Sequence, residues 1–153
     1  MKTGPRMAIL VIYCFCASIA GAQTIPDLSG TWKMNLEKSK WESLDNIRSV
    51  LVRIEHKEPH FSESVTVTSG GGEYTVEGNY TTDGKETEVQ ISSGAVKATA
   101  KWEGEGLLVE WKKEGFHVRR KYNLSADGRT LTSTVYRSTS NGEVEEKSVF
   151  EKQ

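Results

Sequence analysis

Two arginines of this sequence fall on the apolar side of predicted strands. Arg120 and Arg137 each alternate in phase with aliphatic neighbours, which points both side chains toward the predicted core. A buried guanidinium needs a partner, because desolvation of an unpaired ion costs several kcal/mol. The partner could be Glu63 or Glu146, which share the phase of core-facing residues, or the anionic head group of a ligand. The arginines could also reach solvent at the mouth of the fold.

A metal site is the second chemistry to consider. His56, Glu58 and His60 alternate along one stretch, and imidazole with carboxylate suits zinc. Pro59 interrupts that stretch, and no other His or Cys stands where it would complete the ligand set. The Ser and Thr residues lack a nucleophile elbow and a matching His and Asp, so hydrolase chemistry has little support. The sequence therefore predicts no metal, no cofactor and no enzyme activity.

Burial of a ligand is the chemistry that remains. The inward phase of three predicted strands carries large apolar and aromatic side chains, namely Trp102, Val109, Trp111, Val118 and Tyr122. A small apolar or amphipathic molecule packed against them would gain about 25 cal/mol per Å² of buried surface, and Arg120 and Arg137 would orient its polar end. The same side chains could instead fill the interior of a structural or interaction domain. An interior below about 300 Å³ would be too small for an ordinary ligand site and would rule out the carrier function.

Local sequence signals predict ten strands that position these residues. Short runs rich in Val, Thr, Tyr and Trp are separated by turn pairs such as Asp83-Gly84, Asp127-Gly128 and Asn141-Gly142. These pairs tolerate the positive φ of tight hairpins, so each predicts two adjacent antiparallel strands. The predicted strands are 29–36, 48–56, 61–68, 73–81, 85–91, 95–103, 107–113, 116–125, 130–138 and 143–151.

Alternation along these strands gives the sheet one dry face and one wet face. Apolar residues such as Val50, Val52 and Ile54 alternate with polar ones. Little helix is predicted to cover the dry face, since the segment 37–47 holds at most one short helix. The sheet must therefore close on itself, which predicts an all-β fold: a single antiparallel up-and-down β-barrel of about ten strands. A two-sheet sandwich is the alternative.

The N-terminus predicts export. An uncharged, mostly apolar stretch follows Lys2 and Arg6 and ends at the small residues Ala20-Gly21-Ala22. This pattern is typical of a secretory signal peptide that is cut after Ala22. We expect a signal peptide over 1–22, one barrel domain over 23–153, and a secreted or periplasmic location.

Composition limits the partners of the predicted domain. Removing Lys2 and Arg6 from the 20 basic residues leaves 18 against 21 acidic ones, with the two signs interleaved. Nucleic acid binding needs a concentrated basic face, so none is expected. No apolar stretch after residue 22 is long enough for stable membrane insertion. Both cysteines, Cys14 and Cys16, lie in the signal, so core burial must replace disulfides. We expect a monomer whose partner is a small hydrophobic or amphipathic ligand.

The start of the predicted domain resembles that of the calycins. The segment Asp27-Leu28-Ser29-Gly30-Thr31-Trp32-Lys33 carries a Gly-x-Trp on the first strand, as do lipocalins and intracellular fatty-acid-binding proteins. The resemblance implies that Trp32 closes the narrow end of the barrel. The second half, from Lys97 to Lys152, is similar to the meander of a ten-stranded fatty-acid-binding barrel. The opening is also similar to that of short exported bacterial proteins described as lipocalin-like.

The sequence departs from the fatty-acid-binding proteins at two points. Their last strand carries an Arg-x-Tyr that holds the ligand carboxylate, where this chain has Ser148-Val149-Phe150. Their helical lid is replaced by at most one short helix. The resemblance therefore implies an exported, non-enzymatic, lipocalin-like binding protein without naming its cargo. A calycin-type enzyme is a third alternative, and it would need an ionisable cluster at the barrel mouth.

Overall fold

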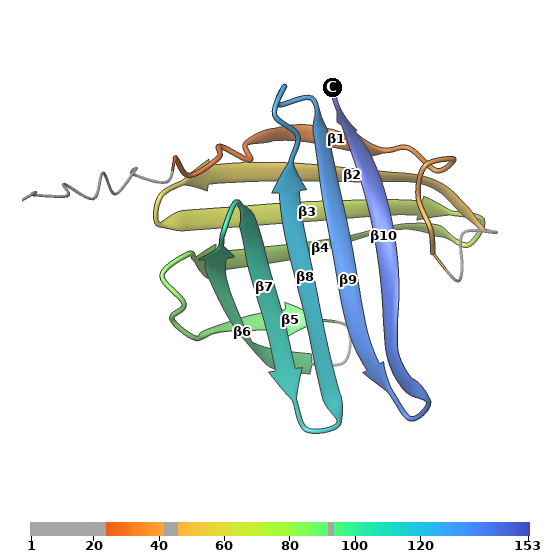
Figure 1. Ribbon diagram of the computed structural model, residues 1–153. Helices are drawn as coiled ribbons and strands as arrows, with labels where there is room; N and C mark the ends of the chain where they lie inside the picture. The colour runs from red at the N-terminus through yellow and green to blue at the C-terminus, as the bar shows by residue number, and fades with distance from the viewer. Residues whose placement is uncertain (1–23, 42–45, 92–93) are drawn as a thin grey trace, which may run out of the picture.

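The computed structural model describes residues 24–41, 46–91 and 94–153, so the predicted signal peptide lies outside the described residues. The strands, labelled in Figure 1, are β1 (Gly30–Met34), β2 (Ile47–Lys57), β3 (His60–Ser69), β4 (Gly72–Thr81), β5 (Thr87–Ile91), β6 (Gly94–Glu103), β7 (Gly106–Lys113), β8 (Phe116–Leu124), β9 (Thr130–Thr139) and β10 (Gly142–Lys152). The structure confirms all ten predicted strands, and each boundary lies within two residues of its predicted position.

The segment between β1 and β2 contains no helix in its described part. Residues 36–38 form a turn, and Lys40 makes a β-bridge with Lys147 through backbone hydrogen bonds of 2.7 and 3.0 Å. The rest of the short helix considered for this segment, residues 42–45, lies outside the described residues. In the described parts of the chain, no helix is long and apolar enough to cross a membrane.

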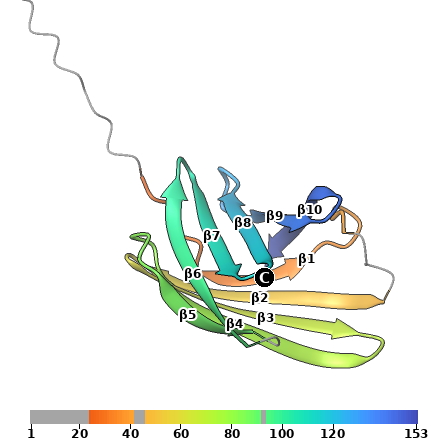
Figure 2. The same cartoon turned by 90° about the horizontal axis from the view of Figure 1, so that it is seen from below.

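The ten strands form one antiparallel sheet in the order β4-β3-β2-β1-β10-β9-β8-β7-β6-β5. Because β1 pairs with both β2 and β10, it joins the two halves of the sheet. Figure 1 shows β2, β3 and β4 running across the direction of β7 to β10, and Figure 2 shows the two halves facing each other across the interior. The fold is a nearly closed up-and-down barrel, as predicted, and not a two-sheet sandwich.

The barrel wall has a gap between β4 and β5. These strands stand at the two ends of the sheet order and are not hydrogen-bonded neighbours. The turn Asp83-Gly84 was predicted to form a hairpin that pairs them, and this prediction is wrong. Instead, the amide of Gly84 donates to the carbonyl of Ala100 over 2.9 Å, and Asp83 bridges to Lys101. The turn therefore binds the β4–β5 connection to β6, and β5 does not pair with β4.

Trp32 lies buried where β1 meets the end of β10. Its side chain is fully buried, its Nε1 donates to the carbonyl of Leu28 over 3.0 Å, and Lys152 Nζ lies 5.2 Å from the centre of its ring. Gly30 has a φ of +142°, and a Cβ there would lie 3.0 Å from Lys152 Cε. Glycine therefore suits this position for both its backbone angle and the close approach of Lys152.

The opposite end of the barrel is open. Tyr74 and Val76 share the inward phase of Tyr80 on β4, yet they are 57% and 40% exposed, and Phe116 at the start of β8 is 37% exposed. Inward-facing residues further along the same strands, such as Tyr80 and Tyr122, are buried. Apolar side chains that face inward and still meet solvent mark this end as the mouth of the barrel.

Candidate functional site

An apolar cavity of about 240 Å³ lies inside the barrel between the mouth and the core. Its apolar lining comes from β3, β4, β5, β7 and β8, and includes Val65, Val67, Val89, Ile91, Trp111 and Val118. Side chains from these strands converge because the inward phase of each strand faces the same interior. Glu63 and Arg120 also line this cavity.

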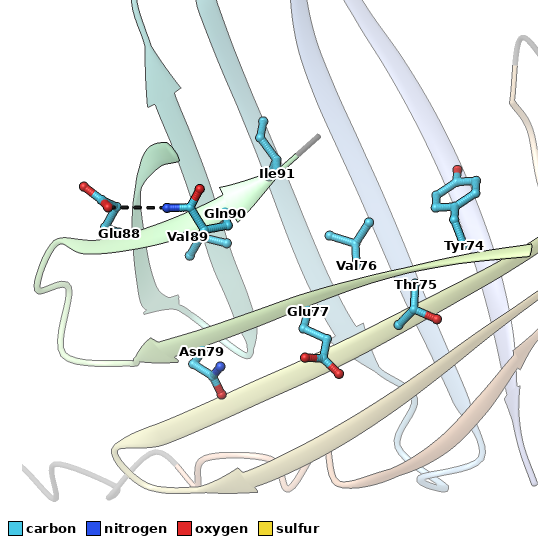
Figure 3. A pocket seen from close by; sticks show the side chains of 9 residues that line it. All are labelled: Tyr74, Thr75, Val76, Glu77, Asn79, Glu88, Val89, Gln90 and Ile91. Atoms are coloured by element: carbon cyan, nitrogen blue, oxygen red, sulfur yellow. Dashed lines mark hydrogen bonds between the residues drawn. The ribbon is translucent and has the colours of Figure 1, made fainter. Parts of the chain in front are cut away.

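A second and larger space of about 760 Å³ runs along the gap between β4 and β5 (Figure 3). Five residues line both this groove and the inner cavity: Tyr74, Val76, Glu77, Val89 and Ile91. The cavity alone is below the limit of about 300 Å³ for an ordinary ligand site, so its volume by itself does not support a carrier function. The groove adjoins the cavity, since these five residues line both spaces.

The polar atoms of the cavity gather on the carboxylate of Glu63. Glu63 is only 6% exposed, and it accepts hydrogen bonds from the hydroxyls of Tyr122 and Tyr80, the latter over 3.3 Å. It also accepts a 3.4 Å bond from Nη1 of Arg120. Arg120 Nη1 and Glu63 Oε2 also meet the distance of an ion pair. The internal ion pair considered for Arg120 is therefore formed.

Arg120 is held by both charge and aromatic surface. Its Nη1 donates to the Tyr122 hydroxyl over 3.0 Å, and its guanidinium carbon lies 5.0 Å from the ring centre of Trp111. Burial disfavours the charged form, but the charge of Glu63 and the hydrogen bond to Tyr122 outweigh burial and raise the pKa of Arg120 above its usual value. Its Nε is buried and has no hydrogen-bond partner. The guanidinium is thus held through Nη1, and its Nε–H is left without an acceptor.

Tyr80 and Tyr122 complete this polar cluster as neutral phenols. Burial raises the pKa of each hydroxyl well above its usual value. The Tyr80 hydroxyl accepts a 3.1 Å hydrogen bond from Nε1 of Trp111 while it donates to Glu63. Each tyrosine therefore connects Glu63 to a second member of the cluster, and the set holds its geometry without any ligand.

Arg137 lies apart from this cluster. Its guanidinium pairs with Glu146, which is 6% exposed, while the Arg137 side chain is half exposed. Arg137 does not line the cavity of about 240 Å³. The internal pairing and the solvent exposure that were considered for this residue are both present.

The predicted ligand-contacting residues separate into two groups. Trp111, Val118 and Arg120 line the cavity, and Tyr122 contacts both charged members of its polar cluster. Val109 is fully buried in the core, and Trp102 donates from Nε1 to Glu58 over 2.7 Å. Neither lines the cavity, so their contribution to binding stays a prediction.

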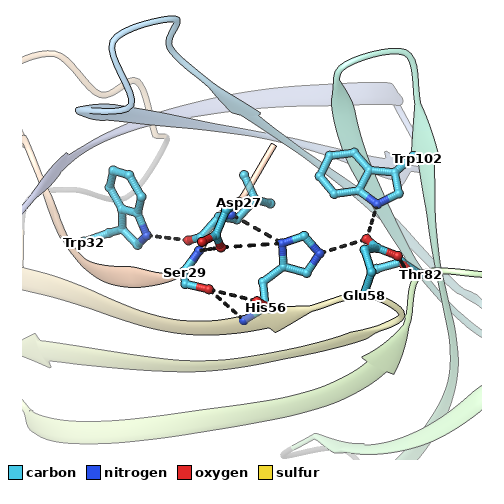
Figure 4. A network of polar contacts seen from close by, with 8 residues as sticks. Asp27, Ser29, Trp32, His56, Glu58, Thr82 and Trp102 are labelled. Carbon is cyan, nitrogen blue, oxygen red and sulfur yellow. Dashed lines mark hydrogen bonds and ion pairs between the residues drawn. The ribbon is translucent and has the colours of Figure 1, made fainter. Parts of the chain in front are cut away.

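A second polar network lies around His56, away from the cavity (Figure 4). The buried ring of His56 accepts the amide of Leu28 at Nδ1 over 3.4 Å and lies 2.8 Å from Glu58 through Nε2, which assigns the proton to Nε2. Glu58 also accepts from Trp102 and, over 2.5 Å, from Thr82. Burial alone would raise the pKa of Glu58, but these hydrogen bonds lower it.

This network connects parts of the chain far apart in sequence rather than holding a metal. Glu58 lies after β2, Thr82 after β4 and Trp102 near the end of β6. In the described residues, no three His, Cys, Asp or Glu side chains are arranged to hold a metal ion. His56 and Glu58, which were considered as metal ligands in the sequence, contact each other over 2.8 Å and form a structural link between these segments.

Comparisons with known proteins agree on the fold. No protein-family model matches the sequence, and no curated protein matches it. Among solved structures, the zebrafish ileal bile acid-binding protein complexed with cholic acid is 17% identical with a TM-score of 0.61, over 82% of this chain and 98% of that one. Fatty-acid-binding protein 1 of Echinococcus granulosus is 15% identical with a TM-score of 0.61, over 81% and 96%. Secretory abundant heat soluble protein 4 of Ramazzottius varieornatus is 20% identical with a TM-score of 0.64, over 86% and 99%.

The chain therefore has the calycin-type fold of the fatty-acid-binding protein barrels, and the resemblance inferred from its opening Gly-x-Trp is confirmed at the level of fold. Its polar cluster has a different arrangement from the one sought in the sequence. The spacing Arg-x-Tyr, which β10 lacks, occurs on β8 as Arg120-Lys121-Tyr122. The side chains of Arg120 and Tyr122 both point inward and are hydrogen-bonded to each other. Alternation predicted the inward direction of Arg120 and Tyr122, but not the hydrogen bond between them.

Proposed function

We propose that this protein is an exported, non-enzymatic carrier that holds a small apolar or amphipathic molecule in the barrel. The observation that carries the proposal is a cavity with apolar walls that ends on a preformed polar cluster, an arrangement suited to orienting one end of a ligand. Trp111, Val118 and Arg120 would contact the ligand. Tyr122 would act through its hydrogen bonds to Glu63 and Arg120.

The size of the cavity defines how a ligand would sit. A volume of about 240 Å³ is the volume that about eight water molecules occupy in the liquid. It therefore accommodates the end of an amphipathic molecule rather than a whole long chain. The remainder would extend through the gap between β4 and β5 into the groove of about 760 Å³. This pose buries apolar ligand surface on both sides of the gap.

Fold similarity supports the proposal at a general level. Two of the similar structures are named for the fatty acids or bile acid that those proteins bind. Export and a monomeric state belong to the same proposal, and the signal-like pattern of residues 1–22 supports export. Native mass spectrometry of the protein purified from its own host would reveal a co-purifying small molecule, and a chain that begins at Gln23 would support export.

The binding test uses the neutral fluorescent probe N-phenyl-1-naphthylamine. Wild-type protein should increase the probe's fluorescence in a saturable titration. The variant Val118→Trp should reduce the affinity at least about tenfold, because the larger side chain occupies the cavity. Thermal unfolding of both proteins would show that the variant remains folded.

His117→Trp is the matched control, since residue 117 precedes Val118 on β8 and faces the outer side of the barrel. This variant should bind the probe like the wild type. If the wild-type protein binds no probe and no small molecule co-purifies, the filled barrel that acts through its outer surface is the correct function class.

A further inference from the structure

The cavity has no spare positive charge. Its charged lining residues in the described part of the chain are Glu63, Glu77 and Arg120. Arg120 is the only cation among them, and it is already paired with Glu63 over 3.4 Å. A ligand carboxylate placed beside Arg120 would therefore also lie beside the carboxylate of Glu63.

The cluster does have a spare hydrogen-bond donor. The hydroxyls of Tyr80 and Tyr122 each donate to Glu63, and each accepts from a neighbour, Trp111 in one case and Arg120 in the other. Arg120 Nε is buried and has no partner, while about a quarter of the Arg120 side chain remains exposed at 26%. A ligand oxygen at the exposed part of the guanidinium could accept a hydrogen bond there, and it need not carry charge.

An anion would meet two penalties at this site. It would lose its hydration in a mostly apolar cavity, and it would be repelled by Glu63 at short range without a free cation in compensation. A neutral oxygen would meet neither penalty. The balance of charge in the site thus favours a neutral oxygen over an anionic group.

We infer that the cavity selects the uncharged polar end of an amphipathic molecule, such as an alcohol, aldehyde, ketone or ester, and disfavours carboxylates. This inference rests on the proposed carrier function and specifies its ligand class. Arg120 donates to the ligand oxygen, while Glu63 keeps the guanidinium neutralised and so acts as the specificity-determining residue.

The test compares two ligands of equal chain length on the wild-type protein. Isothermal titration calorimetry at neutral pH would measure the affinities of 1-decanol and decanoate. We expect decanol to bind at least about tenfold more tightly, since only decanoate adds a charge beside Glu63. The apolar tails are matched, so the difference reports the head group.

A charge-removing variant should remove most of this preference. Glu63→Gln keeps the shape of the side chain but leaves Arg120 without its counter-charge, so decanoate affinity should rise about tenfold while decanol affinity changes little. The matched control is Glu143→Gln. Glu143 on β10 pairs over 2.7 Å with Arg119, which neighbours Arg120 on β8 and points to the outer face. The control should retain the preference for decanol.

The result decides the inference separately from the carrier function. Equal or tighter binding of decanoate by the wild-type protein overturns the inference, whether or not Glu63→Gln folds. Failure of both decyl ligands also overturns it, while binding of N-phenyl-1-naphthylamine decides the carrier function independently. Preference for decanol in the wild type with its loss in Glu63→Gln supports the assignment of Glu63.

Discussion

Gly78 gives Tyr80 the space it needs to reach the polar cluster. Both residues face inward on β4, and a Cβ at Gly78 would lie 2.6 Å from Cε2 of the Tyr80 ring and even closer to its hydroxyl. The Tyr80 ring thus occupies the volume that any other residue at position 78 would fill. The hydrogen bonds that Tyr80 makes to Glu63 and Trp111 depend on this missing side chain.

Gly78→Ala should therefore displace Tyr80 and break both hydrogen bonds. We expect a loss of about 1–3 kcal/mol in the free energy of unfolding, because buried polar atoms lose their partners. Urea denaturation would measure it. Gly71→Ala is the control, since the nearest atom to its new Cβ would be Ser69 Oγ at 3.9 Å. Equal stability of the two variants would contradict this role of Gly78.

At the scale of single residues, the alternation of inward and outward side chains along a strand predicted part of the polar cluster. The inward direction of Arg120 follows from alternation, whereas its pairing with Glu63 was one of several alternatives that alternation left open and that the structure decides. The position of the Tyr80 hydroxyl does not follow from alternation. It depends on the space above Gly78 and on the pairing of β3 with β4, which a single sequence does not contain.

At the scale of elements, Glu58 links the ends of several strands. It accepts hydrogen bonds from Thr82 in the β4–β5 connection and Trp102 on β6, in addition to His56 on β2. The pKa of Glu58 is lowered from 4.5, so its ionised form is favoured by folding. This contribution to stability is complete above about pH 4.5 and is lost as the pH falls through the lower pKa of the folded state.

Removing one donor should weaken this pH-dependent link. Thr82→Val keeps the side-chain shape but removes the 2.5 Å bond to Glu58, so we expect a loss of about 1 kcal/mol at pH 7 and a smaller further loss on acidification than in the wild type. Thermal unfolding between pH 7 and pH 3 would measure both effects. Thr75→Val, which removes an exposed bond to Thr66, should leave the acid profile unchanged. An identical profile for Thr82→Val would contradict the proposed link.

Turn pairs and alternation predicted the strands well but not every strand partner. Eight of the nine connections between consecutive strands join neighbours in the sheet, which is the arrangement that hairpin turns predict. The connection at Asp83-Gly84 differs because Gly84 bonds to Ala100, a residue of β6. Such a contact joins distant parts of the sequence, and hydrophobic periodicity carries no information about it.

At the scale of the whole molecule, the gap predicts uneven protection of the backbone. β3 pairs with β2 on one side and β4 on the other, whereas β4 pairs only with β3 in the order of the sheet. About half of the amide protons of β4 should therefore exchange rapidly with solvent, since alternate amides of an antiparallel strand point to opposite sides. Hydrogen–deuterium exchange with mass spectrometry would compare β4 with β3, which has the same length. Equal protection of the two strands would indicate that the gap is closed in solution.

The same gap bears on how quickly a bound molecule could leave. Because β4 and β5 share no ladder of hydrogen bonds, the wall can widen between them while every paired strand stays paired. Release by this route requires only side chains such as Val76 and Val89 to move apart. The dissociation rate would then be independent of the rate of global unfolding, and a variant that stabilises the barrel elsewhere would retain its cargo no longer than the wild type does.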